Sequence, residues 1–129
     1  MDFLSLNKDA RRARLGSDAV LVDGWAVFSG VTAGDLADDR APLPEYVEDQ
    51  TRKMLANLEA LLGAAGLAKE HVVSVRLSLV DLPKFYERMN AAYVGFFAPD
   101  RLPALSCVGV AALPRGCLVA LDAWARRGA

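Results

Sequence analysis

Histidine and cysteine are scarce in this sequence, which contains one histidine and two cysteines among 129 residues. A structural zinc site draws four ligands mainly from these two residue types, and this set is too small to provide one. Cys107 and Cys117 both lie in apolar, strand-like stretches, where reduced and buried thiols are expected. No glycine loop of the kind that cradles phosphate is present. We therefore expect no metal and no cofactor.

Long apolar runs and a strong net charge are also missing. No stretch approaches the roughly 20 apolar residues of a transmembrane helix, and the first residues show no apolar segment followed by a cleavage site. The net charge of −1 has the wrong sign for a protein that binds mainly through phosphate groups. We expect a cytoplasmic protein without a membrane partner, and nucleic acid is disfavoured as a ligand.

The length of the chain is typical of one folding unit. A sequence of 129 residues buries one hydrophobic core, so we expect a single domain over residues 1–129. Hydrophobic residues make up 53% of the sequence, which exceeds the usual share. No membrane segment takes up this excess, so we expect it in the core or in a subunit interface, and we favour an oligomer.

The first two predicted strands form a hairpin. The β-rich runs Ala19–Val22 and Trp25–Ser29 are separated by Asp23-Gly24. An Asp-Gly pair between apolar runs is a strong hairpin signal, because both turn positions require a positive φ. A loop rich in Gly, Asp and Pro follows over residues 30–44.

Helix and strand patterns then alternate. Apolar residues recur at three- and four-residue steps over Glu45–Ala65, which predicts a helix that Gly66 ends. Strict alternation over His71–Val80 predicts a strand. A second helix is expected after the N-cap residue Asp81, running to about Phe97.

Two final strands complete the predicted fold, at Ala104–Val110 and Cys117–Trp124. The order ββαβαββ predicts an α+β fold in which both helices cover one face of a single mixed sheet. Several strands are apolar at both parities, which is typical of a sheet buried on both faces. We therefore expect other subunits to cover the face that the helices leave open.

The last quarter of the chain carries the most specific pattern. Residues 101–125 read RLPALSCVGVAALPRGCLVALDAWA. This stretch resembles the closing strand pair of the RidA-type (YjgF-like) reactive-intermediate deaminases, whose pattern is P-A-R-S-x-V-x-V-x-x-L-P-x-G-x-x-V-E-I-E-A-x-A. The matching positions are Pro103, Ala104, Ser106, Val108, Val110, Leu113, Pro114, Gly116, Val119, Asp122, Ala123 and Ala125.

The resemblance extends from about Gly16 to Ala125. The sequence also matches the family's S-G after the hairpin, its Q-T-x-x-x-x-x-N helix, its A-A-G-L helix stop and its second helix. It implies a chorismate-mutase-like fold and a homotrimer whose clefts between adjacent subunits bind a small-molecule ligand. The ligand-binding positions that it implies are Gly16, Ser29, Gly30, Asn90, Leu105, Ser106, Cys107 and Ala120.

Two of these positions depart from the family pattern. Leu105 stands where the family has an arginine that grips the carboxylate of an enamine or imine acid such as 2-aminoacrylate. Ala120 stands where the family has a glutamate that helps to place the attacking water. Losing the arginine fork in a buried site costs about 2–5 kcal/mol. The resemblance thus predicts an altered specificity.

The remaining chemically active residues have alternative interpretations. Cys107 and Asp122 are the candidate catalytic residues, Cys107 as a nucleophile and Asp122 as a substitute for the missing acid. The alternatives are packing for Cys107 and a structural ion pair for Asp122, while Asn90 either binds ligand or is merely exposed. Arg101 is a candidate replacement for the missing cation, and Arg115 is expected at the surface.

Three functions follow as hypotheses. The first is a RidA-like hydrolase or deaminase of a reactive enamine, imine or related metabolite. The second is a non-catalytic trimer that binds a metabolite or a protein in the same cleft. The third is RNA cleavage, which the acidic charge balance and the absence of a histidine pair disfavour.

Overall fold

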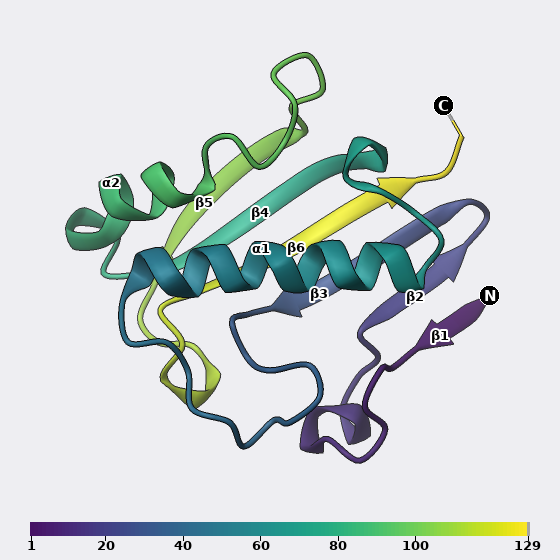
Figure 1. Cartoon of the computed structure of the whole chain (residues 1–129), viewed down its shortest axis with the longest axis horizontal. Helices are drawn as coiled ribbons and strands as arrows, with labels where there is room; N and C mark the ends of the chain where they lie inside the picture. Colours follow the sequence, from purple (N-terminus) through teal and green to yellow (C-terminus); the bar gives the residue numbers. More distant parts are fainter. Residues whose placement is uncertain (129) are drawn as a thin grey trace.

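The computed structural model describes residues 1–128, which form one mixed sheet with two α-helices packed on it (Figure 1). The elements are, in chain order, β1 (Asp2–Leu4), the 3-10 helix η1 (Arg11–Arg14), β2 (Ala19–Val22), β3 (Trp25–Val31), α1 (Val47–Ala64), the 3-10 helix η2 (Lys69–His71), β4 (Val72–Val80), α2 (Leu82–Tyr93), β5 (Ala104–Val110), the 3-10 helix η3 (Pro114–Gly116) and β6 (Val119–Arg126).

The sheet has the strand order β1-β2-β3-β6-β4-β5. β4 and β5 are parallel, and all the other neighbours are antiparallel. Figure 1 shows α1 and α2 on the same side of this sheet, which confirms the predicted architecture. β1 was not predicted from the sequence, because three residues are too few to show an alternating pattern.

The hairpin turn and the ends of the helices are largely as predicted. Asp23 and Gly24 have φ values of 51° and 82°, and Gly66 ends α1 with a φ of 75°. Two details were wrong. Asp81 precedes α2 with a φ of 49° and makes no side-chain capping hydrogen bond, and α2 ends at Tyr93 rather than Phe97.

The core lies between the helices and one face of the sheet. Its largest fully buried side chains come from α1, from α2 and from the helix-facing positions of β3, β4 and β6. Side chains of this kind contribute roughly 2–5 kcal/mol each to stability, measured as the cost of truncation to Ala. They include Phe28, Met54, Leu58, Leu77, Met89 and Leu121.

The far face of the sheet is not covered by any helix within residues 1–128 (Figure 1). Trp124 is 52% exposed there and meets Trp25 edge-to-face, with 6.2 Å between ring centroids. Val108 on β5 is also exposed, at 39%. Strand β4, which lies between β6 and β5, shows polar side chains on this face, with Ser74 and Ser78 in register with both neighbours. The far face therefore combines exposed apolar side chains with a polar strip.

Candidate functional site

A bulge in β3 lies opposite Asp122 on β6. The register between the two strands shifts between Phe28 and Val31, so the two residues Ser29 and Gly30 face one partner residue. The backbone N–H of Gly30 donates to Oδ1 of Asp122 at 2.8 Å. Gly30 has a φ of 66°, a conformation that favours glycine. The carboxylate thus fixes the shape of the chain at this point.

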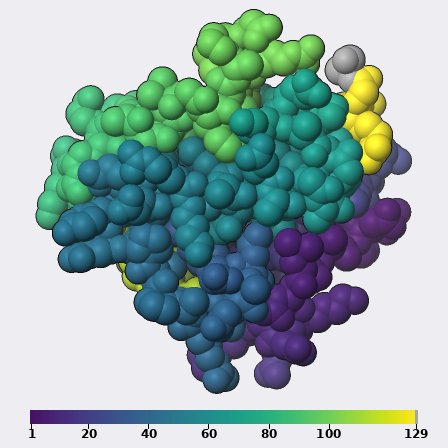
Figure 2. Space-filling view, viewed as in Figure 1, coloured from purple at the N-terminus to yellow at the C-terminus, as the bar shows by residue number. Residues whose placement is uncertain are grey.

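A cavity of about 820 Å³ opens beside this bulge. It lies between the N-terminal segment, the loop after β3 and the turn before β6. Figure 2 shows the N-terminal segment and the loop after β3 in contact at the lower edge of the molecule, where Asn7 donates to the carbonyl of Ala37. Four predicted ligand-binding residues line the cavity, and we call them the cavity group: Gly16, Ser29, Gly30 and Ala120.

Three other predicted residues lie elsewhere, and we call them the β5 group: Asn90, Leu105 and Cys107. Leu105 and Cys107 are in register with Val75 and Leu77, so they point to the helix side of β5. α2, which carries Asn90, packs against β4 and β5. None of the three lines the cavity in the described part of the chain. One protomer therefore carries seven of the eight predicted ligand-binding residues as two separate groups.

Ser106 and Asp122 lie on the far face of the sheet. Both are in register with Arg76, one on each side of β4. Ser106 is thus separated from the two β5 residues next to it in sequence, because side chains alternate along a strand. Arg101, the candidate replacement for the missing cation, is exposed and does not line the cavity, and the same is true of Arg76.

The two predicted catalytic residues differ in their surroundings. Burial raises the pKa of the Cys107 thiol, so the thiol stays protonated at neutral pH rather than becoming a nucleophilic thiolate. Oδ1 of Asp122 is engaged by Gly30, and Oδ2 accepts no hydrogen bond from residues 1–128. Burial also raises the pKa of Tyr93, at the end of α2, to about 12.

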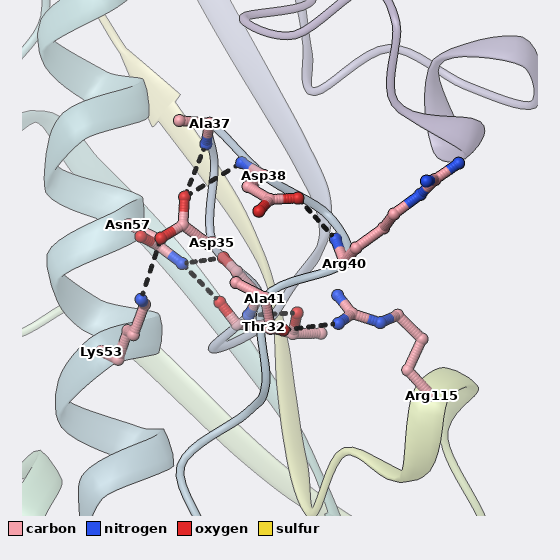
Figure 3. A network of polar contacts seen from close by, with 10 residues as sticks. Thr32, Asp35, Ala37, Asp38, Arg40, Ala41, Lys53, Asn57 and Arg115 are labelled. Atoms are coloured by element: carbon pink, nitrogen blue, oxygen red, sulfur yellow. Dashed lines mark hydrogen bonds and ion pairs between the residues drawn. The ribbon is translucent and has the colours of Figure 1, made fainter.

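Two buried polar residues of α1 hold the loops around the cavity. Asn57 donates through Nδ2 to the carbonyls of Thr32 at 2.9 Å and Gly34 at 2.8 Å (Figure 3). Gln50 donates to the carbonyl of Pro44 at 2.8 Å and accepts from the N–H of Leu118 at 2.9 Å. In the sequence these two residues were noted only as part of a family pattern. Their role becomes visible once the loop is placed beside α1.

The cavity also contains cationic residues that the sequence analysis did not assign to it. Four arginines line it, namely Arg11, Arg12, Arg40 and Arg115. Arg115 is exposed, as expected, but its Nη2 donates to the carbonyl of Ala41 at 3.0 Å across 74 residues of sequence. That separation explains why no local pattern revealed this contact. Within residues 1–128, no helix is long and apolar enough to cross a bilayer, and no cluster of side chains is arranged to hold a metal ion.

A mixed sheet with two helices on one face is the fold of the RidA-like proteins, and the YjgF gene product of Escherichia coli superimposes with a TM-score of 0.77 at 29% identity. Comparison with known proteins agrees with this. The family model of endoribonuclease L-PSP matches residues 10–127. The chain belongs to this family, which confirms the RidA-type resemblance seen in the sequence.

Individual relatives include proteins with a deaminase activity. The chain is 39% identical to a RutC family protein of Synechocystis over 82% of this chain and 81% of the relative. It is 35% identical to the 2-iminobutanoate/2-iminopropanoate deaminase of Salmonella typhimurium over 75% of this chain and 78% of the relative. Among solved structures, Escherichia coli TdcF with bound serine is 28% identical, covers 87% of each chain and superimposes with a TM-score of 0.77.

Proposed function

We propose that the protein is a hydrolase of reactive enamines or imines that works as a homotrimer with clefts between adjacent subunits. The observation that carries this proposal is the division of the predicted residues between the cavity group and the β5 group on one protomer. A cleft between two subunits brings one group from each protomer to the same ligand. The similarity to an imine deaminase supports the reaction class.

The reaction that we propose is hydrolysis of a carbon–nitrogen double bond. Water adds to the imine carbon, the nitrogen takes up protons, and ammonia leaves so that a carbonyl group remains. Asp122 is the acid nearest to the bulge, and we assign its Oδ2 to holding the water, with backbone groups of Ser29 and Gly30 beside it. We assign Cys107 to packing beside the substrate, because its thiol stays protonated.

We further propose an altered substrate preference. Leu105 is 53% exposed on the protomer and carries no charge to pair with a carboxylate. Substrates with an apolar group at this position therefore bind better than 2-aminoacrylate does. Ala120 cannot orient or deprotonate water, so the protein relies on Asp122 for that step.

The test is release of keto acid from enzymatically generated imines. We expect little acceleration with 2-aminoacrylate and measurable turnover with the imine of 4-methyl-2-oxopentanoate, whose side chain suits a leucine. Leu105→Arg together with Ala120→Glu raises turnover of 2-aminoacrylate by about 100-fold. Leu102→Arg adds the same charge at a neighbouring exposed leucine and serves as the control. Rapid turnover of 2-aminoacrylate by the unmodified protein contradicts the role given to Leu105.

A second candidate function is a non-catalytic trimer that binds a metabolite in the same cleft. The loss of both family charges, at Leu105 and Ala120, favours it. In that case 4-methyl-2-oxopentanoate raises the melting temperature while none of the imines is consumed. Turnover of any imine that also binds excludes this candidate.

A further inference from the structure

The arginines that line the cavity outnumber its carboxylates by four to three. The cavity also contains Asp18, Asp35 and Asp39. Asp18 is paired with Arg12 at 3.3 Å and accepts from the N–H of Leu6, so this pair is internally neutral.

The other two aspartates are also engaged. Asp35 accepts from the N–H groups of Ala37 and Asp38 and lies 3.6 Å from Lys53 (Figure 3). These partners hold the pKa of Asp35 below its usual value, with the Ala37 hydrogen bond as the largest cause. Asp39 accepts from the N–H of Arg11.

The guanidinium groups of Arg40 and Arg115 have no carboxylate partner within residues 1–128. Arg115 donates only to a backbone carbonyl, that of Ala41, which positions the group without neutralising it. Its Nη1 lies against Gly34, where a Cβ would come within 3.1 Å. Figure 3 shows Arg115 reaching from η3 to the loop after β3 and Arg40 extending from that loop toward η1, and both side chains line the cavity.

Apolar side chains are exposed at other parts of the proposed cleft. Leu15 borders the cavity and is 93% exposed, at the position next to Gly16. Leu105, in the β5 group, is 53% exposed on the helix side of β5. The cavity volume of about 820 Å³ lies in the range of sites for ligands much larger than a three-carbon acid.

We propose that Arg40 and Arg115 together anchor the anionic group of the substrate, while Leu105 and Leu15 contact its apolar end. This inference rests on the proposed function and names its substrate class: imines or enamines of acids that carry an apolar side chain. The charge is bound at the loop after β3, on the opposite subunit from Leu105. A guanidinium fork gives paired, charge-assisted hydrogen bonds to a carboxylate, so the two arginines fix the orientation of the acid as well as binding it.

Binding is tested apart from turnover, by calorimetric titration with a stable product analogue. The probe is 4-methyl-2-oxopentanoate, and the uncharged 4-methyl-2-oxopentanamide is the matched ligand. The unmodified protein binds the acid at least about tenfold more tightly than the amide. Arg40→Gln combined with Arg115→Gln weakens acid binding by about tenfold or more and leaves amide binding unchanged. Added salt weakens acid binding to the unmodified protein.

Two further variants separate charge from folding. Arg14→Gln removes an exposed arginine of η1 that does not line the cavity, and it retains the affinity of the unmodified protein. Arg40→Gln alone weakens acid binding even if the double variant fails to fold, because the Arg40 side chain makes no hydrogen bond or ion pair within residues 1–128 whose loss would unfold the protein.

The outcomes distinguish this inference from the proposed function. Equal affinity for acid and amide, no binding of either, or acid binding that is the same in Arg40→Gln and the unmodified protein overturns the anchor. If turnover does not depend on the two arginines, the proposed deaminase function stands and their role as an anchor is wrong. If binding of the acid depends on the two arginines but no ammonia is released from any imine, the anchor stands and the proposed deaminase function is wrong.

Discussion

At the scale of one residue, Asp122 has a structural contact and a proposed catalytic role. Its Oδ1 accepts from the N–H of Gly30 and so holds the bulge of β3 in place. Its Oδ2 accepts no hydrogen bond from residues 1–128 and is the atom that we assign to the water. In the family pattern the neighbouring position carries an acid as well, but here that position is Ala120. A single carboxylate therefore serves both the backbone and the proposed reaction.

Substitution of Asp122 separates the two tasks. Asp122→Ala removes the acceptor of Gly30 and lowers the free energy of unfolding by about 1 kcal/mol. Asp122→Asn keeps an acceptor oxygen, so it retains most of the stability but lowers turnover of the apolar imine by about 100-fold. Urea unfolding and keto-acid release are the two measurements. Asp100→Asn, at an exposed loop position, is the control. Full turnover by Asp122→Asn shows that the residue is structural only.

At the scale of an element, α1 does more than cover the sheet. Its apolar face fills the core, while Gln50 and Asn57 reach out of that face to the loops that form the cavity. Both side chains are almost completely buried, at 3% and 8% exposure. Buried amides that are fully hydrogen-bonded specify one loop conformation, because any other leaves them unpaired.

Asn57→Ala is expected to loosen the loop after β3. The carbonyls of Thr32 and Gly34 lose their donor, at a cost of about 1–3 kcal/mol in the free energy of unfolding. The affinity for 4-methyl-2-oxopentanoate falls at the same time, because the same loop carries Arg40. Asn7→Ala is a matched control, since Asn7 also donates to this loop but is only half-buried and makes a single such bond. Its effect on unfolding stays below about 0.5 kcal/mol. Equal effects of the two variants contradict the anchoring role of Asn57.

At the scale of the whole molecule, the far face of the sheet is the candidate interface of the proposed trimer. Trp124 and Val108 are exposed there, and no helix within residues 1–128 covers them. Apolar side chains on a sheet face are stabilised by burial against another subunit. In the proposed trimer the same contact places the β5 group of one protomer beside the cavity group of the next.

Val108→Asp therefore gives monomers. A charge on the buried face of an interface is not compensated, so light scattering coupled to size exclusion detects one chain per particle. Turnover is lost together with assembly, because the two groups no longer meet. Tyr86→Asp adds a charge at an exposed residue of α2, on the other side of the sheet, and leaves the trimer intact. A trimeric Val108→Asp protein shows that the far face is not the interface.

Local patterns predicted most of the elements, and long-range contacts account for what was missed. The Asp23-Gly24 turn and the Gly66 helix stop were predicted because each depends on the φ of its own residues. The bulge opposite Asp122 and the position of Arg115 depend on partners 92 and 74 residues away. No periodicity in the sequence encodes such pairings. The residues that line the cavity therefore could not be predicted from local sequence patterns.

The strand order has a consequence for biosynthesis. Within residues 1–128, β6 follows the other five strands, yet it lies between β3 and β4 and is the only strand that joins the two halves of the sheet. A nascent chain that lacks it holds two separate ribbons, each with an open edge on the inner side. Completion of the sheet must therefore wait until translation has passed Val119–Arg126, and during that interval the unpaired edges are exposed to other chains and to chaperones.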